Sequence, residues 1–107
     1  MLSATENQQL PVAQTLHEKR GKDEIIITTY ALPDGDSYTY SIQCRVGRLV
    51  RAVFPPQIAR TFATPLEAKR AAVAKIRQWT NHSRSLNARL RCFTLLTVEQ
   101  REFDFGD

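Results

Sequence analysis

A chain of 107 residues has the length of a single domain, and folding at this size buries roughly two thirds of the surface that the unfolded chain exposes. Fifteen Lys and Arg residues against eleven Asp and Glu residues give a net charge of +4. Between Arg45 and Arg91 the chain has eleven cations and one acid, Glu67, so its middle is more basic than the total indicates. A local excess of this kind is typical of proteins that bind polyanions.

The inventory of reactive side chains excludes several classes of function. The N-terminal sequence lacks the pattern of a secretory signal, and no apolar run reaches the ~18 residues that span a bilayer. Cys44 and Cys92 form no CxxC motif, and we expect them to be core thiols of a cytoplasmic protein. His17 and His82 have no carboxylate or cysteine at metal-ligand spacing. We therefore expect no metal, no cofactor, no membrane partner and no enzymatic activity.

The first elements in chain order are a helix and a strand. Residues 1–9 are polar and without pattern, and they predict a flexible N-terminus. Residues 10–21, LPVAQTLHEKRG, predict a short helix, because two apolar residues lie four apart and Gly21 can cap the helix end. Residues 24–32, EIIITTYAL, are rich in β-branched side chains and are followed by the turn formers PDGDS, so they predict a strand and a turn.

The segment YTYSIQCRV, residues 38–46, alternates strictly and predicts a strand with one buried face. Its apolar face has Tyr38, Tyr40, Ile42, Cys44 and Val46, and its open face has Thr39, Ser41, Gln43 and Arg45.

The length of the next turn decides which face the following side chains occupy, because a slip of one residue exchanges the two faces. A two-residue turn would put Arg51 opposite Cys44, on the apolar face. A three-residue loop, 47–49, aligns Val50, Ala52 and Phe54 with the apolar face instead. We prefer the longer loop, which leaves Arg45 and Arg51 side by side on the open face.

A second helix is predicted from Thr64, with Thr64 as the cap, Pro65 in the first turn and Glu67 completing a capping box. Its core-facing stripe consists of Leu66, Ala68, Ala72, Val73, Ile76 and Trp79. The helix cations Lys69, Arg70, Lys75 and Arg77 are spread around the remaining surface, which is also typical of a solvated helix face. Beyond the helix, 83–98 predict a further strand, and 99–107 form an acidic and aromatic tail.

The order helix, three strands, helix over about residues 10–80 resembles the double-stranded RNA-binding domain family. The resemblance rests on LPVAQTLHEKRG, YTYSIQCRVG and EAKRAAVAKI, in that order. It implies RNA contacts from the first helix, the loop after the first strand and the start of the second helix. Glu18 matches the acidic position of the first helix, and Lys69 matches the last of the family's helix lysines. Asp34 and Asp36 stand in a loop where they would repel phosphate, and Pro65 and Leu66 replace two lysines.

The chain is also similar to the arm-type DNA-binding domains of phage integrases, which use three strands and a helix. That resemblance implies contacts from the open sheet face, through Gln43, Arg45, Arg48 and Arg51, with a two-stranded ribbon in the major groove. The same residues also suit an ordinary solvated sheet face.

The tail sequence QREFDF, residues 100–105, resembles the hexapeptide with which many bacterial replication and repair proteins bind the sliding clamp. The resemblance implies that Gln100, Phe103 and Phe105 bind a partner protein. The alternative is that both phenylalanines pack on their own domain.

These observations predict an α+β domain, residues 10–82, with a helix, a three-stranded antiparallel sheet and a helix, followed by an extra C-terminal strand or extended tail. The expected function is nucleic-acid binding, to RNA or DNA, without catalysis. The expected nucleic-acid contacts are Gln43, Arg45, Arg48, Arg51, Lys69, Arg70 and Arg77, with the basic residues among them on phosphates. The alternative is a protein-interaction module, such as an adaptor or a mobile-element inhibitor, with a C-terminal docking peptide.

Overall fold

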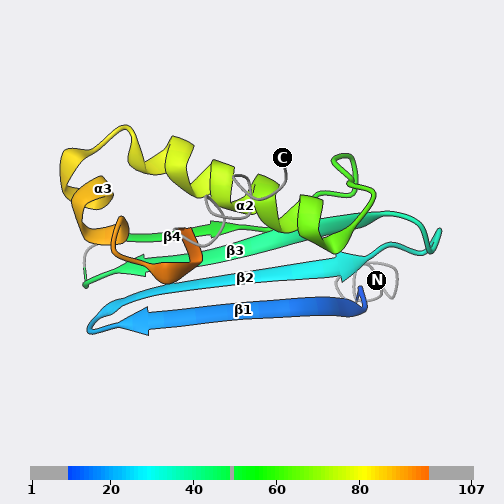
Figure 1. Ribbon diagram of the computed structural model, residues 1–107, viewed down its shortest axis with the longest axis horizontal. Coiled ribbons are helices and arrows are strands. Elements are labelled where there is room, and N and C mark those ends of the chain that lie inside the picture. Colours follow the sequence, from blue (N-terminus) through cyan, green and yellow to red (C-terminus); the bar gives the residue numbers. More distant parts are fainter. Residues whose placement is uncertain (1–9, 49, 97–107) are drawn as a thin grey trace, which may run out of the picture.

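The computed structural model describes residues 10–48 and 50–96. They form a four-stranded antiparallel sheet with two helices on one face, and this confirms the α+β class (Figure 1). The strands follow one another in chain order across the sheet: β1 is Val12–Arg20, β2 is Asp23–Ala31, β3 is Tyr38–Val46 and β4 is Val50–Phe54. Two helices follow, α2 at Pro65–Thr80 and α3 at Arg84–Leu90.

The predicted first helix is wrong, because residues 12–20 form the strand β1. A two-residue turn joins β1 to β2, so that Arg20 pairs with Asp23 and Leu16 with Ile27. Gly21 has a φ of 63°, and the residue read as a helix cap is therefore the turn residue of a hairpin. An isolated helix of this length is marginal in water, whereas pairing with the β-branched strand β2 satisfies the backbone groups on one side of nearly the whole segment.

The two hairpin predictions for the middle of the chain are confirmed. Residues 38–46 form β3, and its inward side chains Ile42, Cys44 and Val46 are buried. The connection between β3 and β4 has three residues, because Val46 pairs with Val50. Cys44 therefore lies opposite Ala52, and Arg45 lies opposite Arg51 on the other face.

Helix α2 begins as the sequence predicts. The Thr64 hydroxyl accepts the N–H of Glu67 at 3.1 Å, and the Glu67 carboxylate accepts the N–H of Ala63 at 3.3 Å. The buried stripe of α2 consists of Ala68, Ala72, Val73 and Ile76, with Trp79 partly buried at its edge. Leu66, which was predicted to belong to this stripe, lies in the first turn and is 41% exposed.

The strand predicted within 83–98 is also wrong: residues 84–90 are the helix α3, and residues 94–96 are helical as well. Ser83 caps α3 by accepting the N–H of Leu86. The apolar residues of this segment fill the core as a helical cluster instead of pairing with the sheet, and Phe93 is fully buried. The resulting core is formed by Ile25, Ile27, Ile42, Cys44, Val46, Ala72, Val73, Ile76, Leu90, Phe93 and Leu96.

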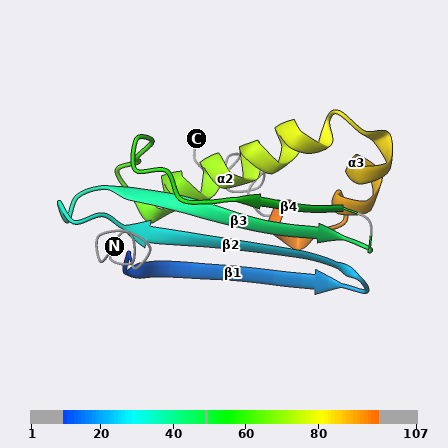
Figure 2. The same ribbon diagram turned by 180° about the vertical axis from the view of Figure 1, so that it is seen from behind.

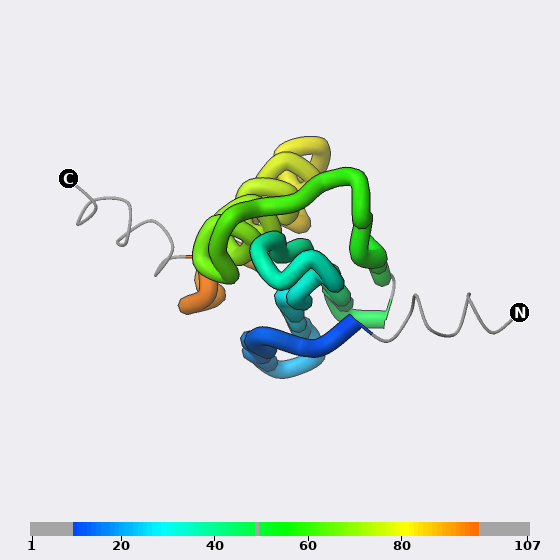
Figure 3. Tube along the Cα trace, turned by 90° about the vertical axis from the view of Figure 1, so that its right-hand side faces the viewer, coloured from blue at the N-terminus to red at the C-terminus, as the bar shows by residue number. Residues whose placement is uncertain are grey.

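The helices cover a single face of the sheet. Figure 2, which shows the molecule from behind, has α2 running along the sheet. In Figure 3, which shows the molecule from one end, both helices lie on the same side of the sheet. Helix α3 lies at the end of the sheet that has the β1–β2 turn and the β3–β4 connection (Figure 1).

The buried carboxylate of Asp23 joins three parts of this end. It accepts the N–H of Gly47 at 2.9 Å, and it accepts two hydrogen bonds from the guanidinium of Arg89, at 2.8 and 3.2 Å. Asp23 is 8% exposed, so its bonds replace those that water would otherwise make. The start of β2, the β3–β4 connection and α3 are therefore held by one side chain.

The carboxylate of Glu18 attaches the last helical residues to β1. It accepts the backbone N–H groups of Thr94 and Leu95, both at 2.9 Å, and the side chain of Arg20 at 2.8 Å. Burial raises the pKa of Glu18, but these hydrogen bonds outweigh it and the pKa lies below its usual value.

We expect Asp23→Ala to lower the free energy of unfolding by about 2 kcal/mol, because it leaves the Gly47 N–H and the Arg89 guanidinium without their acceptor. Thermal or urea unfolding measures this loss. Asp36→Ala is the matched control, because Asp36 lies in an exposed turn, and its cost should stay within about 0.5 kcal/mol. Equal effects of the two substitutions would contradict the role given to Asp23.

We expect the stability that Glu18 contributes to depend on pH in the acid range. Its pKa is lower in the folded than in the unfolded chain, so the contribution is fully present above the unfolded value of 4.5. It is lost as the pH falls through the lower, folded value. The difference in melting temperature between the wild type and Glu18→Gln should therefore shrink as the pH is lowered below 4.5. A difference that is constant with pH would show that ionised Glu18 has no such role.

Candidate nucleic-acid interface

The open face of the sheet has a cross-strand row of charged side chains. The register places Lys19 opposite Glu24, Glu24 opposite Arg45, and Arg45 opposite Arg51, so the row crosses all four strands. Arg45 and Arg51 are both exposed. Like charges directly opposite on an antiparallel pair repel each other, so the β3–β4 end of this row is electrostatically unfavourable by itself.

The carboxylate of Glu24 compensates part of the positive charge of this row. One of its carboxylate oxygens accepts the Arg45 guanidinium at 3.2 Å, and the other is hydrogen-bonded to Nε2 of His17 at 2.5 Å. The hydrogen bond from His17 is the main cause that lowers the pKa of Glu24, and the charges of Arg45 and Lys19 add to it. Glu24 is thus held in its anionic form between two basic side chains, and Arg51 lies beyond its direct contacts.

Two shallow depressions connect the row to the adjacent turns. One has a volume of about 130 Å³, is lined in part by Gln43, Arg45 and Arg51, and also contacts Glu24 and Ile26. The other has a volume of about 230 Å³ and is lined by Lys19, Gly21, Lys22, Arg45, Gly47 and Arg48. Arg45 belongs to both depressions, so they form one continuous basic surface. We call the cations Lys19, Lys22, Arg45, Arg48 and Arg51 the turn-end cluster.

Sequence reasoning found three members of the turn-end cluster and missed two. Arg45, Arg48 and Arg51 were predicted together with Gln43, and the structure brings these four residues to the same surface. Lys19 and Lys22 were missed because residues 10–21 were assigned to a helix, and the hairpin turn at 21–22 was therefore not predicted. The one available signal was Gly21, because glycine suits a hairpin turn as well as a helix cap.

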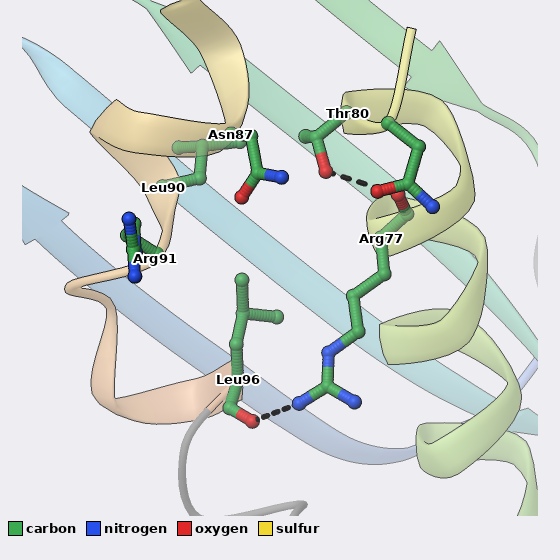
Figure 4. A pocket seen from close by; sticks show the side chains of 7 residues that line it. Arg77, Thr80, Asn87, Leu90, Arg91 and Leu96 are labelled. Atoms are coloured by element: carbon green, nitrogen blue, oxygen red, sulfur yellow. Dashed lines mark hydrogen bonds between the residues drawn. The ribbon is translucent and has the colours of Figure 1, made fainter. Parts of the chain in front are cut away.

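The three helix cations that were predicted to contact phosphate lie elsewhere. Lys69 is only 8% exposed, and Arg70 is partly buried. The guanidinium of Arg77 donates a hydrogen bond of 2.6 Å to the backbone oxygen of Leu96, on the helical side of the molecule (Figure 4). The structure therefore does not bring Lys69, Arg70 and Arg77 to the surface that has the turn-end cluster.

The surface that the double-stranded RNA-binding domain family presents on its first helix is not formed here, because residues 12–20 are a strand. Glu18, matched to that helix, faces inward and binds the backbone at residues 94 and 95. Asp34 accepts the N–H groups of Asp36 and Ser37, so this carboxylate shapes the β2–β3 turn.

The cysteine and histidine side chains have the following environments. Cys44 is buried, and burial raises its pKa to about 11, which disfavours the nucleophilic thiolate. Cys92 was expected in the core but is exposed, and both cysteines are free thiols. His17 is half exposed and paired with Glu24, and His82 is exposed. Within residues 10–48 and 50–96, no group of three His, Cys, Asp or Glu side chains has a metal-binding arrangement.

Two further observations concern other predictions. In the described part of the chain, every helix is too short or too polar to traverse a lipid bilayer. The proposed tail contacts Gln100, Phe103 and Phe105 lie outside the described residues.

Comparison of the chain with protein-family models, with curated proteins and with solved structures found no match.

Proposed function

We propose that this domain binds nucleic acid through the open face of its sheet, with the turn-end cluster on the phosphate backbone. The observation that carries the proposal is the direct pairing of Arg45 with Arg51 on an exposed face. A phosphate between the two guanidiniums converts a repulsive pair into two charge-assisted contacts.

The cations around that pair support a polyanion as the ligand. Five cations and one ionised carboxylate, Glu24, share the surface, so its net charge stays strongly positive after internal compensation. The flexible stems of Lys19, Lys22 and Arg48, near the two turns, allow their charges to follow a curved backbone. Gln43 lies between the cations and the middle of the sheet, where its carboxamide suits the edge of a base.

We further propose that the domain acts by binding and not by catalysis. The thiol with the most perturbed pKa, that of Cys44, is buried and held protonated. The imidazole nearest the proposed interface, that of His17, is engaged with Glu24. Cys44 thus fills the core and His17 pairs with a carboxylate, so the cations are the groups of this surface that can contact a ligand.

The proposal predicts a marked dependence of affinity on salt. Five phosphate contacts on duplex DNA correspond to a slope of about −4.5 in log K against log salt. The assay titrates salt against duplex DNA, duplex RNA and single strands, and the highest affinity at the same salt concentration identifies the ligand class. An affinity that does not depend on salt for any of them would exclude the proposal and favour the alternative, a protein-interaction module.

We expect Arg45→Glu with Arg51→Glu to weaken binding by at least about tenfold and to make the salt slope shallower by about 2. The matched control is Arg60→Glu with Arg84→Glu, which makes the same change in net charge at two exposed positions outside the turn-end cluster. Equal losses in the two variants would mean that only the overall charge matters, which contradicts a defined interface.

We expect Glu24→Gln to strengthen binding a few fold at low salt, because it frees the Arg45 guanidinium from its carboxylate partner. Asp36→Asn removes the same charge from an exposed turn and should change the affinity less. Weaker binding by Glu24→Gln would show that Glu24 takes part in the interface instead of opposing it.

A further inference from the structure

A separate cavity lies in the helical layer, between the end of α2, the helix α3 and the helical residues 94–96. Its volume is about 330 Å³, which falls at the lower end of the range of small-molecule sites. Figure 4 shows side chains from the three segments around it. Its lining consists of Arg77, Thr80, Asn81, Asn87, Leu90, Arg91 and Leu96.

Among the described residues, the lining has two guanidiniums and no carboxylate. Arg77 is partly buried and donates one hydrogen bond to the Leu96 backbone oxygen, which uses one of the five N–H donors of its guanidinium. Arg91 is exposed and comes from the opposite wall, at the end of α3 (Figure 4). A cleft lined by one sign of charge concentrates ions of the other sign.

The helix ends at this cavity account for only part of that positive charge. Both α2 and α3 end here, and each helix C-terminus carries about −0.5 of an elementary charge. Within the part of the chain that the structure describes, the two guanidiniums therefore leave about +1 uncompensated. The backbone oxygen of Arg77 is already occupied, since it accepts the Asn81 N–H and the Thr80 hydroxyl, each at 3.0 Å. The positive charge of the two arginines therefore exceeds the negative charge of the two helix C-termini.

We propose that this cavity binds a small molecule through an oxyanion group, a carboxylate or a phosphate. The guanidiniums of Arg77 and Arg91 supply the charge, and Arg is well suited to such groups because its planar fork matches their oxygens. The carboxamides of Asn81 and Asn87 lie on the two walls as further donors. The side chains of Leu90 and Leu96, which belong to the core, provide an apolar floor for the rest of the ligand.

This site does not depend on the proposed nucleic-acid interface. The cavity is in the layer of helices, whereas the turn-end cluster is on the open face and its turns, and the two sets of lining residues share no member. Either site can therefore be disproved without affecting the other.

The test uses the full chain labelled with ¹⁵N and titrated with inorganic phosphate or with acetate, at constant ionic strength maintained by chloride. We expect saturable shifts of the side-chain signals of Asn81, Asn87 and Arg77. Arg91→Gln should weaken the apparent affinity by about tenfold. Arg84→Gln removes another exposed arginine, at the start of α3 and outside the cavity, and should leave the affinity unchanged. Shifts that do not saturate, or equal effects of the two substitutions, would overturn the proposal.

A second variant identifies the source of the oxyanion. Glu99, Glu102, Asp104 and Asp107 follow the cavity residue Leu96 in sequence, so a full chain with these four residues changed to Gln or Asn removes the carboxylates that come soonest after the cavity residues along the chain. Tighter phosphate binding by this variant would support the site and show that the chain's own carboxylates compete for it. Unchanged binding would support the site and show that its ligand comes from outside. Loss of the saturable shifts would contradict it.

Discussion

The length of the connection between β3 and β4 is the constraint on which the arrangement of charge depends. Three residues between Val46 and Val50 align the inward faces of the two strands and leave Arg45 opposite Arg51 on the outward face. A connection shorter by one residue would put Arg51 against Cys44, in the core, where an unpaired guanidinium costs several kcal/mol. The same register thus fixes both the apolar face of β4 and its basic face. A slip of one residue would expose the apolar side chains of β4, and this cost keeps Arg45 and Arg51 opposite each other.

The β2–β3–β4 part of the fold could be predicted from sequence because it is specified locally. Strict alternation in residues 38–46 gives one face, and the next segment fits that face in only one register. The helix α2 has its own signals in Thr64, Pro65 and Glu67. The signals of the first and last elements are weaker: Gly21 fits a helix cap as well as a hairpin turn, and α3 has only its cap residue Ser83. Residues 12–20 alternate weakly, since Glu18 faces inward to hold a backbone more than seventy residues away in sequence, a long-range contact that no local pattern reveals. The sequence around Phe93 likewise favours a strand. In the structure Phe93 instead packs into the core between the sheet and the helices, and this packing is not visible in the local sequence.

The candidate site was predictable to the same extent as the strands beneath it. Arg45 and Arg51 followed from register, and Arg48 from its place in the connection. Lys19 and Lys22 reach the same surface only because residues 12–20 form the strand β1. Glu24 pairs with Arg45 across the strands β2 and β3, a contact between residues that are distant in sequence. The helix cations illustrate the opposite case. Charge along a helix is visible in the sequence, but Lys69 is largely buried and Arg77 binds the Leu96 backbone, and both facts depend on how the helix packs.

The position of β1 at the border of the sheet has a consequence for how molecules of this domain meet at high concentration. Within the described residues, the outer side of β1 has no strand beside it, and a bare strand edge invites pairing with the edge of another molecule. The ladder between β1 and β2 is interrupted between Val12 and Gln14, which breaks the regular edge near one end. Lys19 and Arg20 put positive charge at the other end. An approaching copy of the same strand therefore meets an irregular stretch and a repulsive one, and these features oppose the growth of continuous sheets between molecules.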